Sequence, residues 1–415
     1  MTSILDSAKA ARAAGRLVAA TSGATRTAAL HLIAKGLREN TASIVAANAR
    51  DLEAGRAKGL DASFLDRLML NEARIEGMAK AVEEIAAQND PIGMVESETI
   101  RPTGIRVARE RIPLGVVAVI YEARPNVTSD AAALAIRSGN AVILKGGSDA
   151  SYSNEAVGKV VSKAIADAGL PAESVQVLIT KERSELTEML KLDAYIDVVI
   201  PRGGEGLIRF VTEHSRIPVI KHFKGVCHVY FDRAADFDMA REIIINAKTQ
   251  RPSVCNTAET LLVHQDIAED ILPLVAEDLQ ARGVTLHGCA ETQRILGDRV
   301  VPATDDDWAE EYLSLDLAVR VVPNIDEAIT HIQRWNSDHT EAIISNDIRA
   351  TQEFRARVQS SCVMINASTR FADGGELGLG AEIGISTSRL HAYGPMGAEG
   401  LTTLRFVVTG QGQVR

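Results

Sequence analysis

The chain has 415 residues, of which 46% are hydrophobic, 24% are charged and only 4% are aromatic. This composition is ordinary for a globular protein, and the length predicts two or three domains rather than one core. The net charge of −10 argues against a nucleic-acid partner, because proteins that bind nucleic acids carry basic surfaces.

The four cysteines lie far apart and have neither metal-ligand spacing nor the pattern of a disulfide framework. They are Cys227, Cys255, Cys289 and Cys362. The first residues are not a charged stretch followed by an apolar core, and no apolar run approaches the roughly 18 residues of a membrane span. We therefore expect a cytoplasmic protein with no metal and no membrane partner.

The first part of the chain, up to about residue 90, predicts helices. Leu30, Ile33 and Leu37 share one helical face, and Pro91 stops the last of these helices. Residues 94–112 differ, because polar and apolar residues alternate and four arginines occur among them. This pattern predicts a protruding hairpin, either a plain surface feature or a device for subunit pairing.

From Pro113 onward, apolar strands alternate with helices. Strands are predicted at 114–121, 141–144, 175–179, 197–200 and 218–220, with helices that include 127–137, 154–168 and 204–213. A second unit follows, with strands at 228–232, 260–264, 318–322, 342–345 and 362–366 and helices that include 239–248 and 267–282. Continuously apolar strands between helices predict parallel sheets covered on both faces. A glycine-rich tail should then form tight loops and a short strand at 402–408.

One cysteine lies where a catalytic nucleophile could lie. Pro252 and Ser253 break regular structure just before Cys255, and the apolar run 260–263 follows. The thiol should therefore lie on a loop that leads into a buried strand, where it can face a cleft. The alternative is a small buried apolar residue, which free cysteines usually are.

Two glycine turns follow predicted strands, at 145–148 and 202–204. Helix N-termini at the carboxyl ends of parallel strands bind anions, so each turn could hold part of a nucleotide. Lys145 could reach ribose hydroxyls or an added phosphate, and Arg202 with Gly203 and Gly204 suits a pyrophosphate. Neither turn matches a standard nucleotide-binding motif, so both could be ordinary turns.

Two further features have alternative interpretations. Asn126 closes the first long strand, and its amide could donate to a developing oxyanion or could cap the next helix, as Thr128 could. Lys221, His222 and Lys224 are three basic side chains within four residues. They could be a solvated edge, or an anion pocket that favours a thiolate if this turn faces the cysteine.

Four sequence stretches together resemble the aldehyde dehydrogenase superfamily. They are GVVAVIYEARPNVT at 115–128, ILKGGS at 143–148, RPSVCNTAET at 251–260, and GAEIGISTSRLH at 380–391 with YGPMG at 393–397. The resemblance covers essentially the whole chain. It implies an α/β fold with two doubly wound α/β domains, one for the cofactor and one for catalysis, plus an oligomerisation flap.

The resemblance also implies domain boundaries. The NADP-binding domain would comprise residues 1–97 and 113–227, and the catalytic domain residues 228–392. The hairpin at 98–112 and the C-terminal strand within 393–415 would form the flap of a homo-oligomer, either a dimer or a tetramer.

By the same resemblance, Cys255 is the nucleophile and Asn126 supplies the oxyanion amide. Lys145 would contact the adenosine ribose, and Glu311 would hold the nicotinamide ribose, although the Phe-Gly-Pro near that glutamate in ordinary members is absent. The full set of implied cofactor-binding residues is Lys145, Gly146, Ser148, Arg202, Gly203, Gly204 and Glu311.

One departure from ordinary members is informative. They carry Glu-Leu-Gly-Gly-Lys, whose glutamate activates the water that hydrolyses the thioester, whereas residues 221–225 here read Lys-His-Phe-Lys-Gly. The missing carboxylate favours a member that does not hydrolyse its thioester, and the basic residues suit the release of phosphate from an acyl phosphate. The resemblance implies the branch of the superfamily that reduces L-glutamyl 5-phosphate with NADPH to L-glutamate 5-semialdehyde and phosphate, with Lys221, His222 and Lys224 near the phosphate. That reaction is the second step of proline biosynthesis, so a transient contact with the upstream glutamate kinase is also expected. The alternatives are a hydrolytic NAD(P)-dependent aldehyde dehydrogenase on another small aldehyde, and a nucleotide-binding protein without turnover.

Overall fold

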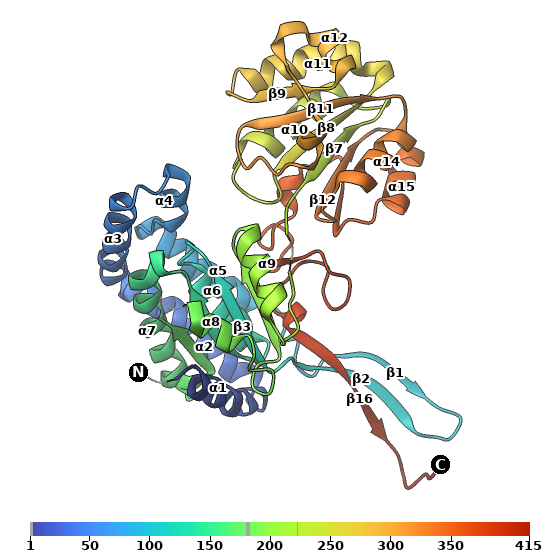
Figure 1. Ribbon diagram of the computed structural model, residues 1–415. Coiled ribbons are helices and arrows are strands. Elements are labelled where there is room, and N and C mark those ends of the chain that lie inside the picture. Colours follow the sequence, from blue (N-terminus) through green and yellow to red (C-terminus); the bar gives the residue numbers. More distant parts are fainter. Residues whose placement is uncertain (1–2, 180–182, 222) are drawn as a thin grey trace. The chain divides into compact units, whose positions relative to one another are not determined.

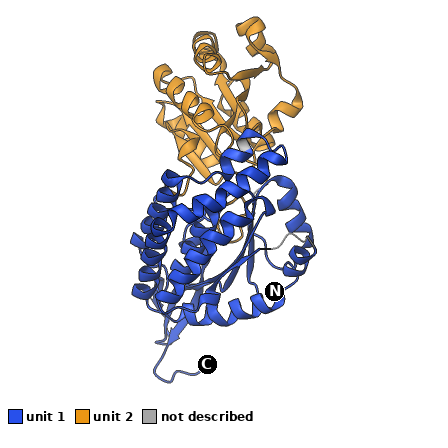
Figure 2. Ribbon diagram, turned by 90° about the vertical axis from the view of Figure 1, so that its left-hand side faces the viewer, with its two compact units in different colours: residues 1–221, 378–384, 395–415 blue, residues 222–377, 385–394 orange. Residues whose placement is uncertain are grey.

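The computed structural model describes residues 3–179, 183–221 and 223–415, and it divides into two compact units. Unit 1 comprises Met1–Lys221, Gly378–Gly384 and Pro395–Arg415, and unit 2 comprises His222–Leu377 and Ile385–Gly394 (Figure 2). The domain boundary expected after residue 227 lies slightly inside unit 2. The hairpin and the C-terminal strand group with unit 1.

Five helices open unit 1: α1 (Ile4–Ala19), α2 (Gly23–Glu39), α3 (Thr41–Ala57), α4 (Ala62–Leu68) and α5 (Glu72–Ala87). As predicted, Leu30, Ile33 and Leu37 lie on one buried face of α2. Ser22 and Asn71 each accept a hydrogen bond from the first turn of the helix that follows them, which stabilises those N-termini.

A four-stranded parallel sheet of order β5-β4-β3-β6 forms the centre of unit 1. Its strands are β3 (Val116–Tyr121), β4 (Ala141–Gly146), β5 (Val175–Leu178) and β6 (Val198–Arg202), and its helices are α6 (Val127–Arg137), α7 (Ser151–Asp167), α8 (Arg183–Met189) and α9 (Glu205–His214). The chain runs from β3 outward to β5 and then returns to the other side of β3. Parallel sheets bind ligands at such a reversal, at the carboxyl ends of the strands. The strand predicted at 218–220 is only a bridge between Val199 and Val219.

The predicted hairpin is present in unit 1 and is part of a three-stranded antiparallel sheet (Figure 1). Its strands are β1 (Val95–Ile100), β2 (Arg106–Pro113) and β16 (Thr402–Thr409), in the order β1-β2-β16. Every residue of β1 is exposed, and the large apolar side chains of Ile100, Phe406 and Val408 are also exposed.

Unit 2 is built on a seven-stranded parallel sheet of order β10-β9-β11-β8-β7-β12-β13. Its strands are β7 (Cys227–Phe231), β8 (Ala258–His264), β9 (Thr285–Gly288), β10 (Val301–Pro302), β11 (Asp316–Val322), β12 (Thr340–Ile344) and β13 (Cys362–Ile365). Its helices are α10 (Phe237–Thr249), α11 (Gln265–Gln280), α12 (Ala290–Leu296), α13 (Asp305–Ala309), α14 (Ile325–Trp335) and α15 (Ile348–Arg357), and the glycine-rich tail adds β14 (Ile385–Ser386) and β15 (Gly394–Pro395). The sequence did not predict β9 and β10, because both are short and neither is a continuous apolar run.

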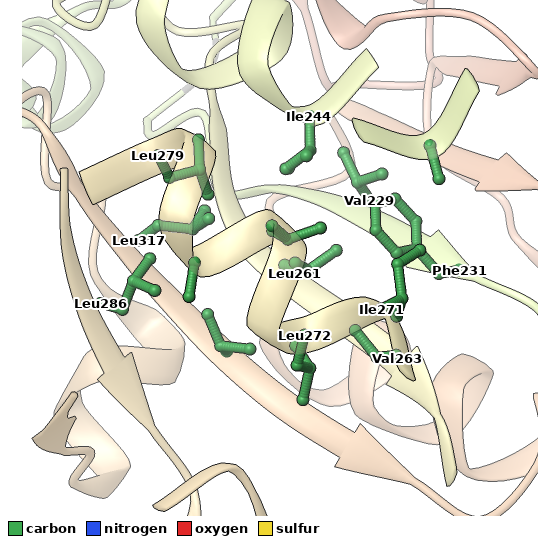
Figure 3. Close-up of a cluster of buried hydrophobic side chains, with 14 of the residues drawn as sticks. Val229, Phe231, Ile244, Leu261, Val263, Ile271, Leu272, Leu279, Leu286 and Leu317 are labelled. Atoms are coloured by element: carbon green, nitrogen blue, oxygen red, sulfur yellow. The ribbon is translucent and has the colours of Figure 1, made fainter. Parts of the chain in front are cut away.

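Alternate residues along the strands of unit 2 enter two different apolar clusters. Val229, Leu261 and Val263 pack against α10, α11 and α12 (Figure 3). Tyr230 and Leu262 belong to the second cluster, which includes residues of α14 and α15. Helices therefore cover both faces of the sheet, which confirms the predicted α/β class. No helix in the described part of the chain is long and apolar enough to cross a membrane.

Replacing Leu261 should destabilise unit 2. Leu261 is fully buried in the middle of β8, so Leu261→Ala should lower the free energy of unfolding by about 2–5 kcal/mol through lost methyl burial and a cavity. The control Leu274→Ala, on α11 and 37% exposed, should change it by at most about 0.5 kcal/mol. Both tryptophans, Trp308 and Trp335, lie in unit 2, so denaturant titration followed by tryptophan fluorescence reports its unfolding. Equal effects of the two substitutions would contradict the core position of Leu261.

Candidate active site

Cys255 lies in the turn between α10 and β8 and is half-buried. Thr257 Oγ1 donates to the Arg251 carbonyl at 2.8 Å, which closes the turn around the cysteine. The buried Asn256 donates its amide to the Ala372 carbonyl at 3.0 Å. As predicted, the thiol lies on a loop that leads into a fully buried strand.

Three segments that precede parallel strands meet at Cys255. Gly225 packs so closely that a Cβ atom added there would lie 2.0 Å from the Cys255 carbonyl oxygen. Cys227 begins β7 and donates its S–H to the same oxygen at 3.2 Å, and its Sγ lies 3.7 Å from Nδ1 of His339, just before β12. Burial raises the pKa of the Cys227 thiol, which keeps it protonated as a donor. The cysteine site is therefore at the amino edge of the sheet.

A carboxylate that is distant in the sequence lies at this edge of the sheet. Glu311 accepts a hydrogen bond from the Gly225 N–H at 2.9 Å, and burial raises the pKa of Glu311. Lys224 Nζ lies 3.8 Å from a Glu310 carboxylate oxygen. The segment 221–225 has no carboxylate in its own sequence, but folding brings two to it. His222 lies outside the described residues, and Lys221 is half-buried in unit 1.

Lys248 and Glu259 form an ion pair of 2.5 Å in which both side chains are fully buried. They flank the cysteine loop, Lys248 on α10 and Glu259 on β8. The second oxygen of Glu259 accepts from the Leu313 N–H at 3.3 Å, and Lys248 Nζ lies 5.7 Å from the Tyr312 ring centroid. Burial raises the pKa of Glu259 to about 8 and lowers that of Lys248, while their mutual attraction opposes both shifts. The pair therefore fixes the segment that carries Glu311 next to the cysteine loop.

Arg370 is a cation near the cysteine that the sequence interpretation passed over. It follows β13, is half-buried, and donates from Nε to Gln250 Oε1 at 2.9 Å. Burial lowers the pKa of Arg370, the negative charge of Asp373 opposes that shift, and a thiolate at Cys255 would oppose it as well. Its position after a strand end, in Ser-Thr-Arg, was the available sequence signal.

The predicted cofactor residues of unit 1 gather at the carboxyl edge of its sheet. Tyr121 at the end of β3 pairs in register with Gly146 on one side and with Arg202 on the other. Lys145 and Ser148 therefore lie next to the end of β3. Lys145 Nζ donates to the Gly146 carbonyl at 3.1 Å, and burial lowers the pKa of Lys145.

The turn before α9 already holds an anionic group. The Gly204 N–H donates to a Glu122 carboxylate oxygen at 2.9 Å. A Cβ atom on Gly203 would lie 2.3 Å from that oxygen, so a larger residue there would require the Glu122 side chain to shift. This carboxylate oxygen stands in for the phosphate oxygen that a dinucleotide would place at the helix N-terminus. The turn therefore fits a pyrophosphate if Glu122 moves aside, and Arg202, 3.6 Å from Glu382, lies at the same edge.

Asn126 precedes α6, but its side chain does not cap the helix. Its Nδ2 donates to Asp130 Oδ2 at 2.9 Å. Thr128 does not cap it either, because its hydroxyl contacts the Tyr121 hydroxyl at 2.7 Å and donates to Asn154 at 3.2 Å. The capping alternative for Asn126 and Thr128 is therefore wrong. In the part of the chain that the structure describes, no group of three or more His, Cys, Asp or Glu side chains is placed to hold a metal ion.

Several known proteins are similar to this chain over nearly its whole length. Residues 2–292 match the family model described as "Aldehyde dehydrogenase family". The chain is 54% identical over 405 residues to a gamma-glutamyl phosphate reductase of Geotalea daltonii, covering 98% of this chain and 97% of that one. It is 52% identical over 404 residues to the protein of that name from Xanthomonas axonopodis pv. citri, covering 97% of each.

Solved structures show the same likeness. A crystal structure of gamma-glutamyl phosphate reductase from Thermotoga maritima has a TM-score of 0.95 and 44% identity, covering 99% of both chains. An engineered glycolyl-CoA reductase with bound NADP+ has a TM-score of 0.71 and 16% identity, covering 99% of this chain and 97% of that one. At that identity the second likeness concerns the fold alone.

Removing one partner of the buried pair should destabilise unit 2. Lys248→Met leaves Glu259 buried without its partner, so the free energy of unfolding should fall by about 3–5 kcal/mol. The folded-state pKa of Glu259 is already raised, and loss of the lysine raises it further. The folded variant therefore binds a proton that the unfolded chain releases, and its stability should rise as the pH falls from 9 to 6.

Tryptophan fluorescence during denaturant unfolding, repeated at several pH values, checks this prediction. Arg294→Met removes an exposed cation of unit 2 that pairs with Glu269 and Glu291, and it should have little effect. A Lys248→Met variant as stable as the Arg294→Met variant at pH 9 would contradict the assignment of a buried, coupled pair.

Proposed function

The chain belongs to the aldehyde dehydrogenase family, and we propose that it reduces L-glutamyl 5-phosphate with NADPH to L-glutamate 5-semialdehyde and phosphate. This reaction is the second step of proline biosynthesis from glutamate. The observation that carries the proposal is identity of 52–54% over nearly the whole chain to proteins named gamma-glutamyl phosphate reductase. The cysteine on a firmly held loop supplies the chemistry, because a thiolate can accept an acyl group from an acyl phosphate.

In the first step the Cys255 thiolate attacks the γ-carbonyl carbon of the substrate. A carbon–sulfur bond forms, and the Asn126 amide donates to the oxygen that becomes negative. The bond from carbon to the phosphate oxygen then breaks, and inorganic phosphate leaves with the bonding electrons. Lys221, His222, Lys224 and Arg370 are the cations proposed to hold that phosphate.

Each proposed cofactor residue would hold a particular part of the dinucleotide. Lys145, Gly146 and Ser148 would hold the adenosine ribose, while Arg202 and the Gly203-Gly204 turn would hold the pyrophosphate and Glu311 the nicotinamide ribose. When bound, NADPH supplies the hydride that reduces the thioester carbon. The resulting thiohemiacetal collapses, its carbon–sulfur bond breaks, and the semialdehyde leaves while Cys255 returns to the thiolate.

The position of Glu311 favours a second candidate function. Glu311 is a partly buried carboxylate of raised pKa that contacts Gly225, whose backbone packs on Cys255. A carboxylate in that place could activate water, as in a hydrolytic aldehyde dehydrogenase. The two functions differ in whether phosphate or water removes the acyl group from the cysteine.

We also propose a cytoplasmic homo-oligomer, either a dimer or a tetramer, that pairs through the β1-β2-β16 sheet. Exposed apolar residues on a sheet favour association, because water is removed from them on contact. A transient contact with the glutamate kinase that makes the acyl phosphate is part of the same proposal, since acyl phosphates are reactive toward water.

The reverse reaction tests the function most directly. With L-glutamate 5-semialdehyde and NADP+, native protein should form NADPH only when inorganic phosphate is present, because phosphate must remove the acyl group from Cys255. Absorbance at 340 nm follows the product. Cys255→Ala should lose essentially all activity, whereas Cys289→Ala, which changes a thiol outside the cysteine loop, should keep it.

Turnover without phosphate would instead indicate hydrolysis. In that case Glu311→Gln should remove the phosphate-independent activity, and the acyl phosphate proposal would be wrong. Full activity of Cys255→Ala would exclude the thioester route in either form.

A charge on the flap sheet should dissociate the oligomer. Phe406 is 66% exposed on β16, and Phe406→Asp would require a carboxylate to be buried in the proposed interface. Size-exclusion chromatography with light scattering should then give the monomer mass in place of the native oligomer. Val414→Asp, at a site that is 93% exposed and beyond the sheet, should keep the native mass. An unchanged mass for Phe406→Asp would place the interface elsewhere.

A further inference from the structure

Asn126 and Asp130 form a hydrogen bond at the start of α6, and Asp130 has no role in the mechanism proposed above. We propose that Asp130 is a positioning residue, which fixes the carboxamide of Asn126 so that an N–H group, and not its oxygen, faces the reacting acyl oxygen. This inference rests on the role of Asn126 in the proposed function.

The geometry holds one side of the carboxamide and leaves the other open. Asn126 Nδ2 donates to Asp130 Oδ2 at 2.9 Å across one turn at the start of α6. Ser129 Oγ lies between the two residues, because it donates to the Asn126 carbonyl at 2.9 Å and contacts Asp130 Oδ1 at 3.2 Å. Asp130 is half-buried, whereas Asn126 is exposed. Among the described residues Asn126 Nδ2 has this single partner, so its second N–H can serve a ligand.

The chemistry of the two groups decides which way the carboxamide points. An ionised carboxylate only accepts hydrogen bonds, whereas a carboxamide has a donating nitrogen and an accepting oxygen of nearly equal size. Only the nitrogen of Asn126 can therefore face Asp130, since the reversed rotamer would set two acceptor oxygens against each other. Burial raises the pKa of Asp130 to about 6, so the carboxylate is ionised at pH 8. An oxyanion needs fixed donors, and a carboxamide free to reverse would present its oxygen part of the time.

A negative charge at Asp130 also has an opposing effect. It disfavours a second negative charge on the nearby acyl oxygen, so the gain from orientation must exceed this repulsion. Asp130→Asn separates the two effects. It removes the charge, and its own carboxamide can either accept from Asn126 or donate to it, so the preference for one rotamer is lost while the size is kept.

The experiment measures kcat and KM for the phosphate-dependent reverse reaction at pH 8. Loss of one oxyanion donor typically costs about 10²–10³ in kcat, and Asn126→Ala should fall in this range. Asp130→Ala should lose about 10-fold to 100-fold in kcat, and Asp130→Asn about 3-fold, with KM for phosphate and for NADP+ little changed in both. Asp167→Asn on α7, an exposed carboxylate in an ordinary i,i+4 ion pair, is the matched control and should behave as native.

The double variants distinguish positioning from general support of the fold. If Asp130 acts through Asn126, Asp130→Ala should cause no further loss in the Asn126→Ala background. Independent losses that multiply would overturn the proposal, and so would an Asp130→Asn variant as active as native or faster. An Asn126→Ala variant with full activity would also overturn it by removing its premise. If the native protein itself shows no phosphate-dependent turnover, the proposed function is refuted, and this outcome is distinct from a failure of the Asp130 proposal.

Discussion

The buried ion pair of Lys248 and Glu259 is the interaction on which the cysteine site depends. Taking two charges out of water costs several kcal/mol for each ion, and a short contact alone seldom offsets this. Here the pair has additional partners, because Glu259 also accepts from Leu313 and Lys248 lies over the Tyr312 ring. Lys248 lies in the last turn of α10 and Glu259 lies near the start of β8. Their ion pair therefore joins the two ends of the loop that carries Cys255. The pair thus contributes geometry to the site more than net stability.

The candidate site residues of the two units lie at opposite edges of their parallel sheets. In unit 1 the cofactor candidates lie at the carboxyl ends of β3, β4 and β6, where such sheets ordinarily bind ligands. In unit 2 Cys255, the proposed nucleophile, lies at the amino ends of β7, β8 and β12. That edge suits a nucleophile because segments entering adjacent strands converge there, which is why Gly225 can pack directly on the Cys255 backbone.

Sequence patterns predicted those parts of the fold that depend on local order. Apolar runs such as 260–263 indicated the strands, and the turn before Cys255 indicated that the thiol lies on a loop. The short strands β9 and β10 were missed because their stability comes from neighbouring strands rather than from their own residues. The contact of Glu311 with Gly225 joins residues 86 positions apart. Periodicity in the sequence does not indicate which distant loop will pack against Gly225. The contact of Glu122 with Gly204 was not predicted, because the two residues lie in different turns that only the folded chain brings together. The hydrogen bond between Asn126 and Asp130 spans only four residues. The sequence nevertheless allows Asn126 either to cap α6 or to pair with Asp130, and only the position of the helix start distinguishes the two.

The order of the two units along the chain has a consequence for biosynthesis. Unit 1 is discontinuous, since Gly378–Gly384 and Pro395–Arg415 return to it after unit 2 has been passed. At ordinary translation rates residues 222–377 take roughly 10–30 s to synthesise, and β2 lacks its partner β16 during all of that time. Unit 2 can acquire most of its native contacts before β16 has been synthesised, whereas the sheet of order β1-β2-β16 can form only afterwards. Unit 1 is thus completed after unit 2, and until β16 arrives the edge of β2 is open to pairing with other nascent chains.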